Sequence, residues 1–305
     1  DWVWIKNRDT TDSHVLTDAV RGATKIISSD SSAAEATDAD TLTAFESDGF
    51  ALGDDDKVNT NTEKYASWNW KANGSGSSNT DGDITSTASA NTTSGFSIVT
   101  YSGNGSDNQE IGHGLGIAPK MIFSKRRNAS SSNWTTYHDS VGINQVFYLN
   151  DNAVPSSNTE QYRATPSSTV YTVGVGGDIN NSSGTYVAYV FAEVEGFSEF
   201  GSFNGNGSAD GPFVYLGFKP AIVIFKNTTQ AYNWQIRDNK RDPFNVNQHS
   251  ISPSISDAEA PTSDKLDFLS NGFKIRDSGA TNNGSGDSII YAAWADSPFK
   301  TANAL

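Results

Sequence analysis

Aromatic side chains are the residues of this sequence with the most obvious capacity for ligand binding. The chain has seven Trp, eleven Tyr and sixteen Phe, and such rings either fill a core or stack on a flat ligand such as a sugar ring. Trp70, Phe191 and Trp294 occupy equivalent places in three repeated segments, which favours core packing for most of the aromatic residues. The tryptophans retained as candidates for glycan binding are Trp2, Trp4, Trp134 and Trp234.

Carboxylates supply a second possible chemistry. Asp54, Asp55 and Asp56 form a run of hard oxygen ligands in a loop, which is the candidate site for calcium. Paired carboxylates can hydrolyse glycosides, but that mechanism depends on a separation that a sequence does not give. Abundant acid in a chain with few lysines more commonly serves solubility. Calcium is therefore the one cofactor that we consider.

The nucleophiles and bases of common enzymes are scattered in this sequence. It contains no HExxH, GxSxG or CxxC motif. The Gly-rich stretches at 103–105 and 205–207 lack the Lys-Ser pair and the following helix of a phosphate loop, so we interpret them as turns. The four histidines are His14, His113, His138 and His249. We expect no catalytic residue.

Net charge and composition exclude several classes of partner. The 305-residue chain carries a formal charge of −14, which repels phosphate backbones and anionic membrane faces. Its basic clusters, at 125–127 and 240–241, are short. No stretch approaches the roughly 18 apolar residues of a membrane span, and without cysteine the chain is neither a disulfide scaffold nor a thiol enzyme. We expect neither nucleic-acid binding nor membrane insertion.

The elements that would position these residues are short strands. Runs of Val, Ile, Phe, Tyr and Trp alternate with polar residues and are separated by Gly- and Asn-containing turns. In GFSIVTY, residues 95–101, this alternation places Phe96, Ile98 and Thr100 on one face. Strands that recur at this spacing favour two sheets closing over their apolar faces. The sequence predicts an all-β fold of tandem, jelly-roll-like β-sandwich domains.

Three copies of one unit account for most of the chain. GFSIVTYSGNG (95–105) returns as GFSEFGSFNGNG (196–207), and Lys6, Lys125 and Lys226 follow equivalent apolar runs. Each copy closes on a similar strand: YASWNWKA, YVAYVFAE or IIYAAWAD. A unit of about 100 residues can support its own core. We expect domains at 1–72, 95–195 and 196–305, with a Ser/Thr/Asn/Gly-rich linker at 73–94.

The first copy differs from the others because it lacks a counterpart to residues 95–118. We therefore expect this sequence to be part of a longer polypeptide. We also expect the corresponding place in the sheet to be either empty, which leaves an exposed edge, or filled. A strand from another chain or from residues 84–90 would fill it.

Several phrases spread over the chain carry a family resemblance. WIKNRD, AAEATDADTLT, TDGDITSTASANTTSGFSIVTYSGNG, FAEVEGFS and LSNGFKI resemble a repeated domain of unassigned function in virion proteins of marine tailed bacteriophages, of the cyanophage and pelagiphage type. The resemblance implies a non-enzymatic structural or adhesion protein of the virion, such as a tail-fibre component. The family offers no catalytic motif to transfer.

That resemblance also implies partners and location. We expect the protein to lie in the extracellular particle, to contact other virion proteins, and to bind host-surface glycans. Appendages built on rotational axes favour a homo-oligomer, and a trimer is expected. The alternatives are a secreted or surface carbohydrate-binding adhesin of bacterial origin and, third, a polysaccharide-degrading enzyme.

Overall fold

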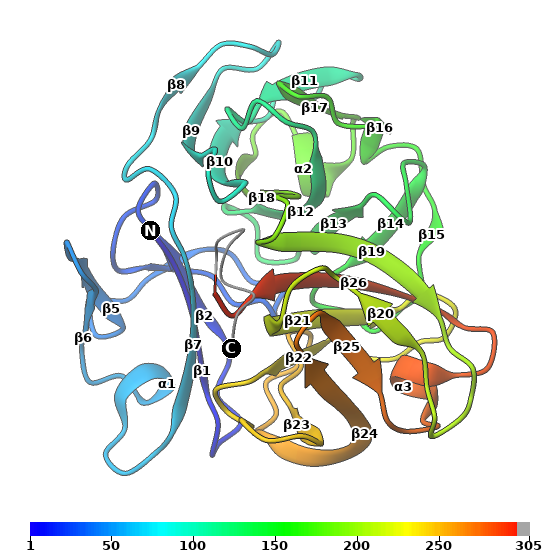
Figure 1. Cartoon of the computed structure of the whole chain (residues 1–305). Coiled ribbons are helices and arrows are strands. Elements are labelled where there is room, and N and C mark those ends of the chain that lie inside the picture. Colours follow the sequence, from blue (N-terminus) through cyan, green and yellow to red (C-terminus); the bar gives the residue numbers. More distant parts are fainter. Residues whose placement is uncertain (298–305) are drawn as a thin grey trace.

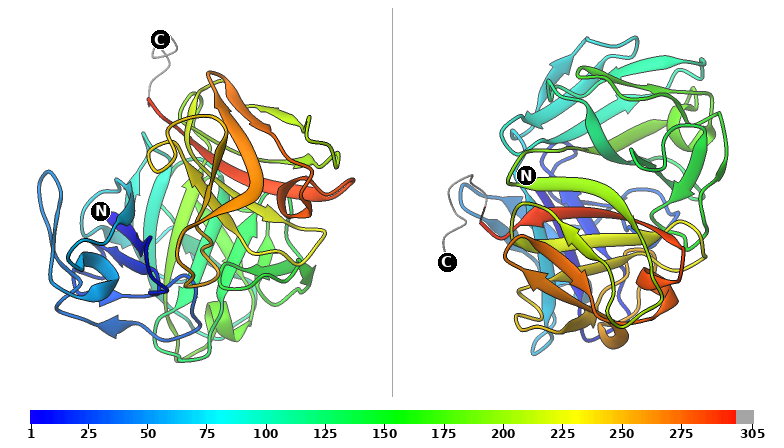
Figure 2. Two further views of the ribbon diagram at one scale, coloured as in Figure 1. Left: turned by 90° about the horizontal axis from the view of Figure 1, so that it is seen from below. Right: turned by 45° about the vertical axis from the view of Figure 1, so that its right-hand side comes forward.

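The computed structural model describes residues 1–297, and these residues confirm an all-β, sandwich-type fold. Residues 298–305, the end of the expected third domain, lie outside the described part. We use repeat 1 for residues 1–72, repeat 2 for 95–195 and repeat 3 for 196–297. Figures 1 and 2 show the three repeats as blue, green and orange-red groups that surround a common centre.

Repeat 1 has one three-stranded sheet, in the order β2-β1-β7, and two small hairpins, β3-β4 and β5-β6. A four-residue helix, α1, precedes the last strand (Figure 1). The elements are β1 (Trp2–Asn7), β2 (Val15–Asp18), β3 (Lys25–Ile26), β4 (Ala36–Thr37), β5 (Leu42–Phe45), β6 (Phe50–Leu52), α1 (Asp56–Asn59) and β7 (Tyr65–Trp70).

Repeat 2 has an inner sheet in the order β13-β12-β18-β10 and an outer sheet in the order β11-β17-β16. Strands β14 and β15 continue the inner sheet beyond β13. The elements are β10 (Phe96–Ser102), β11 (Gln109–Gly112), β12 (Pro119–Arg126), β13 (Trp134–His138), β14 (Gln145–Tyr148), β15 (Ser156–Ser157), β16 (Tyr162–Ala164), β17 (Val170–Val173), α2 (Gly177–Asn180) and β18 (Thr185–Ala192).

Repeat 3 follows the same plan, with an inner sheet β19-β26-β21-β22 and an outer sheet β20-β25-β24-β23. The elements are β19 (Ser198–Asn204), β20 (Phe213–Tyr215), β21 (Pro220–Asn227), β22 (Gln235–Asp238), β23 (Asn247–Ser250), β24 (Ala260–Leu269), β25 (Gly272–Ile275), α3 (Ala280–Asn283) and β26 (Ser288–Ala295).

The segment at 73–94, which composition suggested as a linker, contains two strands. Strand β9 (Ser86–Asn91) pairs with β10, and β8 (Ser77–Asn79) pairs with β9, so both extend the sheet of repeat 2. Hydrogen bonds anchor the segment, because the Ser86 hydroxyl donates to the Gly112 carbonyl and Ser89 Oγ accepts the N–H of Asn73. This Ser/Thr-rich sequence forms strands because its backbone pairs with the edge strand β10 of repeat 2.

The three inner sheets share one apolar core. Each contributes buried side chains to it, among them Trp2 and Trp4 from β1, Phe123 from β12 and Ile224 from β21. Separate sandwich cores lie under the outer sheets of repeats 2 and 3 and under the hairpins of repeat 1. Strands β12, β18, β21 and β26 are therefore covered on both faces, which explains their nearly continuous burial.

Hydrogen bonds join the repeats in a closed ring. Trp134 of repeat 2 donates its indole N–H to the Ser28 carbonyl of repeat 1, at 2.8 Å. Trp234 of repeat 3 donates to the Tyr148 carbonyl of repeat 2, at 2.9 Å. His14 stands in the equivalent place of repeat 1, and its Nε2 lies 3.0 Å from the Ser252 carbonyl of repeat 3. We call the three contacts the 1–2, 2–3 and 3–1 seams.

Candidate functional site

The tryptophans that sequence suggested as glycan contacts lie in the interior. Trp2, Trp4, Trp134 and Trp234 are each at most 1% exposed. Trp2 stacks on Tyr189 with ring centroids 4.2 Å apart, and Trp4 donates its indole N–H to His14 Nδ1. None of these four rings presents a face to solvent, so the candidate set needs correction. The alternating pattern placed Trp2 and Trp4 on one face of β1. In the structure, that face packs into the core shared with the inner sheets of repeats 2 and 3.

The aspartates at 54–56 serve the start of helix α1. The Asp55 carboxylate accepts the N–H of Lys57 as an N-cap and also pairs with the Lys57 ammonium at 3.0 Å. Asp56 lies in the first helical turn, where a negative charge is favourable. Within residues 1–297, no group of three or more His, Cys, Asp and Glu side chains is arranged to hold a metal ion. Asp55 and Asp56 therefore have a structural role at the start of α1, and calcium binding by this run stays a prediction.

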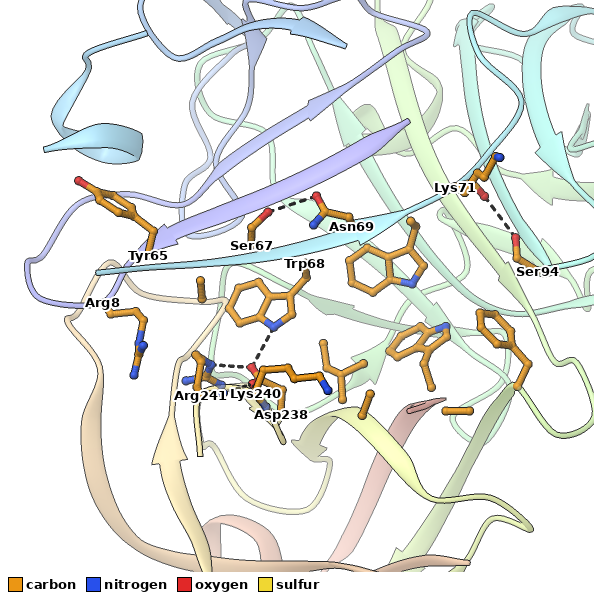
Figure 3. Close-up of a pocket in the computed structure, with 17 residues that line it drawn as sticks. Arg8, Tyr65, Ser67, Trp68, Asn69, Lys71, Ser94, Asp238, Lys240 and Arg241 are labelled. Atoms are coloured by element: carbon orange, nitrogen blue, oxygen red, sulfur yellow. Dashed lines mark hydrogen bonds and ion pairs between the residues drawn. The ribbon is translucent and has the colours of Figure 1, made fainter. Parts of the chain in front are cut away.

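A groove at the 3–1 seam is the strongest candidate for a binding site. It encloses about 560 Å³ and runs along β7, facing β21, β22 and the end of β26. Figure 3 shows Trp68 directed toward Asp238 and Arg241, with Ser67 and Asn69 on the opposite face of β7. Aromatic side chains from β7, from the end of β26 and from the residue before β19 line it: Trp68, Trp70, Trp294 and Phe197.

The polar end of the groove is a tightly paired cluster. Trp68 donates its indole N–H to Asp238 at 3.0 Å, and Arg241 pairs with the same carboxylate at 2.6 Å. The guanidinium of Arg241 also pairs with Glu259 and lies 5.5 Å from the Trp68 ring centroid. Burial acts to raise the pKa of Asp238, but the charge and hydrogen bonds of Arg241 lower it below its usual range. Asp238 is thus held as a carboxylate.

Basic side chains outnumber acidic ones among the lining residues. Arg8, Lys71, Lys240 and Arg241 line the groove, whereas Asp238 is the one carboxylate among the lining residues given for it. Arg8 is neutralised by Glu259 at 2.5 Å, and Lys240 pairs with Asp296 at 3.3 Å. The groove is therefore less acidic than the rest of a chain with a net charge of −14, and it suits a ligand that carries negative charge.

Sequence reasoning missed this groove because it forms between distant segments. Trp68 and Trp294 were noted as aromatic residues of equivalent closing strands, but nothing in their spacing showed that β7 faces repeat 3. The available signal was the absence of a counterpart to residues 95–118 in repeat 1.

The equivalent lysines of repeats 2 and 3 are buried and donate hydrogen bonds to backbone carbonyls of a neighbouring repeat. Lys125 donates to the Ser32 carbonyl at 2.9 Å, and Lys226 donates to the Asn152 carbonyl at 3.1 Å.

Comparisons with known proteins give a family without a function. No match appears among curated proteins or among solved structures. None of the helices described in residues 1–297 has the length and apolar character needed to cross a membrane. A family model described as a domain of unknown function, DUF7483, matches residues 1–298 and so runs through all three repeats. The chain belongs to this family of domains of unknown function.

Proposed function

We propose that this protein is a non-enzymatic structural and adhesion component of a phage particle, and that it acts by binding and assembly. The observation that carries the proposal is the groove at the 3–1 seam, where aromatic walls meet a strand edge that has no partner among the described residues. A concave, largely apolar site with a few convergent polar groups is the usual form of a binding site. The phage origin rests on the sequence resemblance.

The chemistry of the groove supports binding in preference to turnover. Glycoside hydrolysis needs two carboxyl groups, one of which must carry a proton to donate. Asp238 is the one carboxylate among the lining residues given for the groove, its pKa is lowered, and its oxygens are occupied by Arg241 and Trp68. The neighbouring Glu259 is paired with Arg8 and Arg241, and Asp238, held as a carboxylate, lacks the proton that this mechanism requires.

Glycan binding is the second candidate, and the composition of the groove favours an acidic polymer. Trp70 and Trp294, whose ring centroids lie 5.3 Å apart, line the groove but are only 8% and 5% exposed. A sugar ring would contact these narrow apolar surfaces. Lys71 and Lys240 extend from the rim, where they would attract carboxylate or sulfate groups. A host-surface polysaccharide, in a phage or in a bacterial adhesin, would suit such a site.

Retention and turnover can be measured together. The purified chain is incubated with neutral and acidic bacterial polysaccharides, and both co-sedimentation and newly released reducing ends are followed, while sedimentation velocity reports self-association. We expect retention or self-association without reducing ends, and weaker binding in an Ala221→Trp variant, which fills the groove from β21. Reducing ends that accumulate with time would contradict the proposal, as would a protein that neither binds nor assembles.

A further inference from the structure

The outer edge of β7 carries unpaired backbone groups. The Arg8 N–H donates to the Lys64 carbonyl, which continues the β1–β7 ladder. Backbone groups of an antiparallel strand alternate between its two edges. The even-numbered residues of β7 therefore face β1, and Tyr65, Ser67 and Asn69 turn their N–H and carbonyl groups toward the groove. In the described part of the chain no strand pairs with that edge.

The same edge is paired in both other repeats. In repeat 2, β10 pairs along β18, and the Ala192 N–H donates to the Gly95 carbonyl. In repeat 3, β19 pairs along β26, and the Ala295 N–H donates to the Phe197 carbonyl. Lys71 is the equivalent residue of repeat 1. Strand β9, which follows repeat 1 in the sequence, pairs with β10 and not with β7.

The opening strands of repeats 2 and 3 also show what fills the space beside such an edge. Phe96 and Ile98 of β10, and Phe200 of β19, point inward and belong to the shared core. Phe96 contacts Trp2 of repeat 1 across the 1–2 seam, with ring centroids 5.6 Å apart. Ile222 occupies the equivalent place to Trp2, because each pairs with the closing aromatic residue of its sheet. Ile222 lines the groove.

The face of β7 that points away from the shared core is exposed to solvent, whereas the equivalent face of β18 is buried. Ser67 and Asn69 are exposed, and their side chains bond only to each other in the contacts recorded for them, at 3.2 Å. At the equivalent positions, Ala188 and Val190 of β18 are fully buried. Ala188 and Val190 belong to the core under the outer sheet of repeat 2, and this face of β7 lacks the cover that such a sheet gives.

We propose that the groove receives an extended polypeptide strand that residues 1–297 do not supply, added antiparallel to β7 in the manner of β10 and β19. This inference rests on the proposed function and names the occupant of its site. The register of the other repeats places an aromatic or a small residue opposite Trp70, as with Phe96 and Ser198, and an apolar residue opposite Trp68. Main-chain hydrogen bonds supply the affinity, and the inward side chains supply the specificity.

Charge favours a strand of the repeat 3 type. The sequence GFSEFGSFNGN, residues 196–206, carries Glu199 at the place that would lie opposite Asn69. Residues directly opposite each other in an antiparallel pair share a face, so Glu199 would lie on the Asn69 face of β7, near the exposed Lys71. This peptide therefore combines the inward Phe200 with a negative charge beside Lys71.

The peptide GFSEFGSFNGN is the probe, and binding to the full chain is followed by calorimetry and tryptophan fluorescence. Asn69→Pro removes an N–H that faces the groove and leaves the β1 ladder intact, whereas Asn69→Ala removes the side chain and keeps the N–H. We expect Asn69→Pro to weaken peptide binding by at least about tenfold and Asn69→Ala to leave it nearly unchanged. A peptide with Phe200→Ser should bind as weakly as Asn69→Pro does. Thermal unfolding verifies that both variants are folded.

An intramolecular version removes the dependence on peptide affinity. A second copy of residues 95–118 is joined in front of Asp1, with a control in which Phe96 and Ile98 of that copy are aspartate. We expect the first fusion to raise the melting temperature by several degrees, to protect tryptophan from acrylamide quenching, and to abolish peptide binding. The control fusion should do none of these.

The outcomes separate this inference from the proposed function. A parent chain that ignores the peptide, together with a fusion that behaves like its control, overturns strand addition. If an acidic polysaccharide then binds and Asn69→Pro leaves that binding unchanged, the occupant is a glycan and the proposed function stands. If neither probe binds and the chain does not assemble, both proposals fall.

Discussion

The 1–2 and 3–1 seams contain the same polar cluster in two different surroundings. Arg21 pairs with Asp18 and Glu35 and donates to the hydroxyl of Tyr189, and Arg241 pairs with Asp238 and Glu259 beside Trp68. Tyr189 belongs to β18, whose outer edge is paired, and Trp68 belongs to β7, whose edge is open. The cluster is thus shared by repeats 1 and 3, and the groove follows from one unpaired edge.

The sharpest way to test the comparison is a proline at the same place in both strands. Val190 of β18 pairs with Ser97 of β10, so Val190→Pro removes an interior ladder bond and a buried side chain. We expect it to cost about 3 kcal/mol or more and to prevent folding in practice. Asn69→Pro, on the open edge, should cost no more than about 1 kcal/mol. Urea unfolding measures both, and similar losses would show that the β7 edge is not free.

Removing the arginine of each cluster should give the next largest effect. Arg21→Ala leaves the Asp18 charge buried, with both side chains fully buried in the parent, and we expect a loss of about 3–5 kcal/mol in unfolding free energy. Arg241→Ala should cost roughly half as much, because the groove admits water to Asp238. Equal losses would mean that the groove is closed to water in solution.

Two buried histidines predict a loss of stability in mild acid. Burial lowers the pKa of His14 to about 3 and that of His138 to about 4. Each ring accepts an N–H at Nδ1 and faces a carbonyl at Nε2, so the neutral form is required. Because unfolded histidine binds a proton near pH 6.5, the unfolded state holds more protons below that pH, and stability falls as the pH falls.

The expected loss is about 1.4 kcal/mol per histidine between about pH 7.5 and pH 5.5. His14 takes the place that Trp134 and Trp234 hold in the other repeats, and those indoles do not titrate. His113 is also buried, and burial lowers its pKa as well. His14→Gln should therefore remove about 1.4 kcal/mol of the total change, which unfolding at the two pH values measures. A His14 ring signal that titrates near pH 6.5 in NMR spectra would contradict the assignment.

The smallest predicted effect concerns the short helices. Asp55 caps α1, whereas Gly176 and Gly279 begin α2 and α3 without a side-chain hydrogen bond. Asp55→Ala should cost about 1 kcal/mol and Asp55→Gly only a few tenths. Calcium or a chelator should leave the melting temperature unchanged in both variants and in the parent. A melting temperature that rises with calcium would restore the metal interpretation.

The sequence predicted the type of fold well because its signals are local. Alternating apolar residues and Gly-containing turns indicated β-strands, and equivalent residues such as Trp70, Phe191 and Trp294 revealed the repeats before any coordinates. In the structure these three rings meet, with centroids 5.3–6.0 Å apart. Repetition therefore pointed to packing even where the partners were unknown.

The shared core and the groove were not predictable in the same way. Periodicity tells which face of a strand is apolar, but it does not tell what covers that face. Trp2 and Trp4 were candidates for glycan binding because each repeat was treated as a separate sandwich, whereas in the structure they belong to the core that the three repeats share. The groove depends on the distance between Trp68 and Asp238, which are 170 residues apart in sequence.

The closed ring of seams has a consequence for stoichiometry. Three copies that are joined in one chain stay together at any dilution, which three separate subunits would not. Because the copies are encoded separately, each is also free to diverge, as His14 has from Trp134 and Trp234. A symmetric trimer of one repeat would present three open edges, whereas the ring described by residues 1–297 presents β7 once. A partner that occupies this edge should bind with one copy per chain.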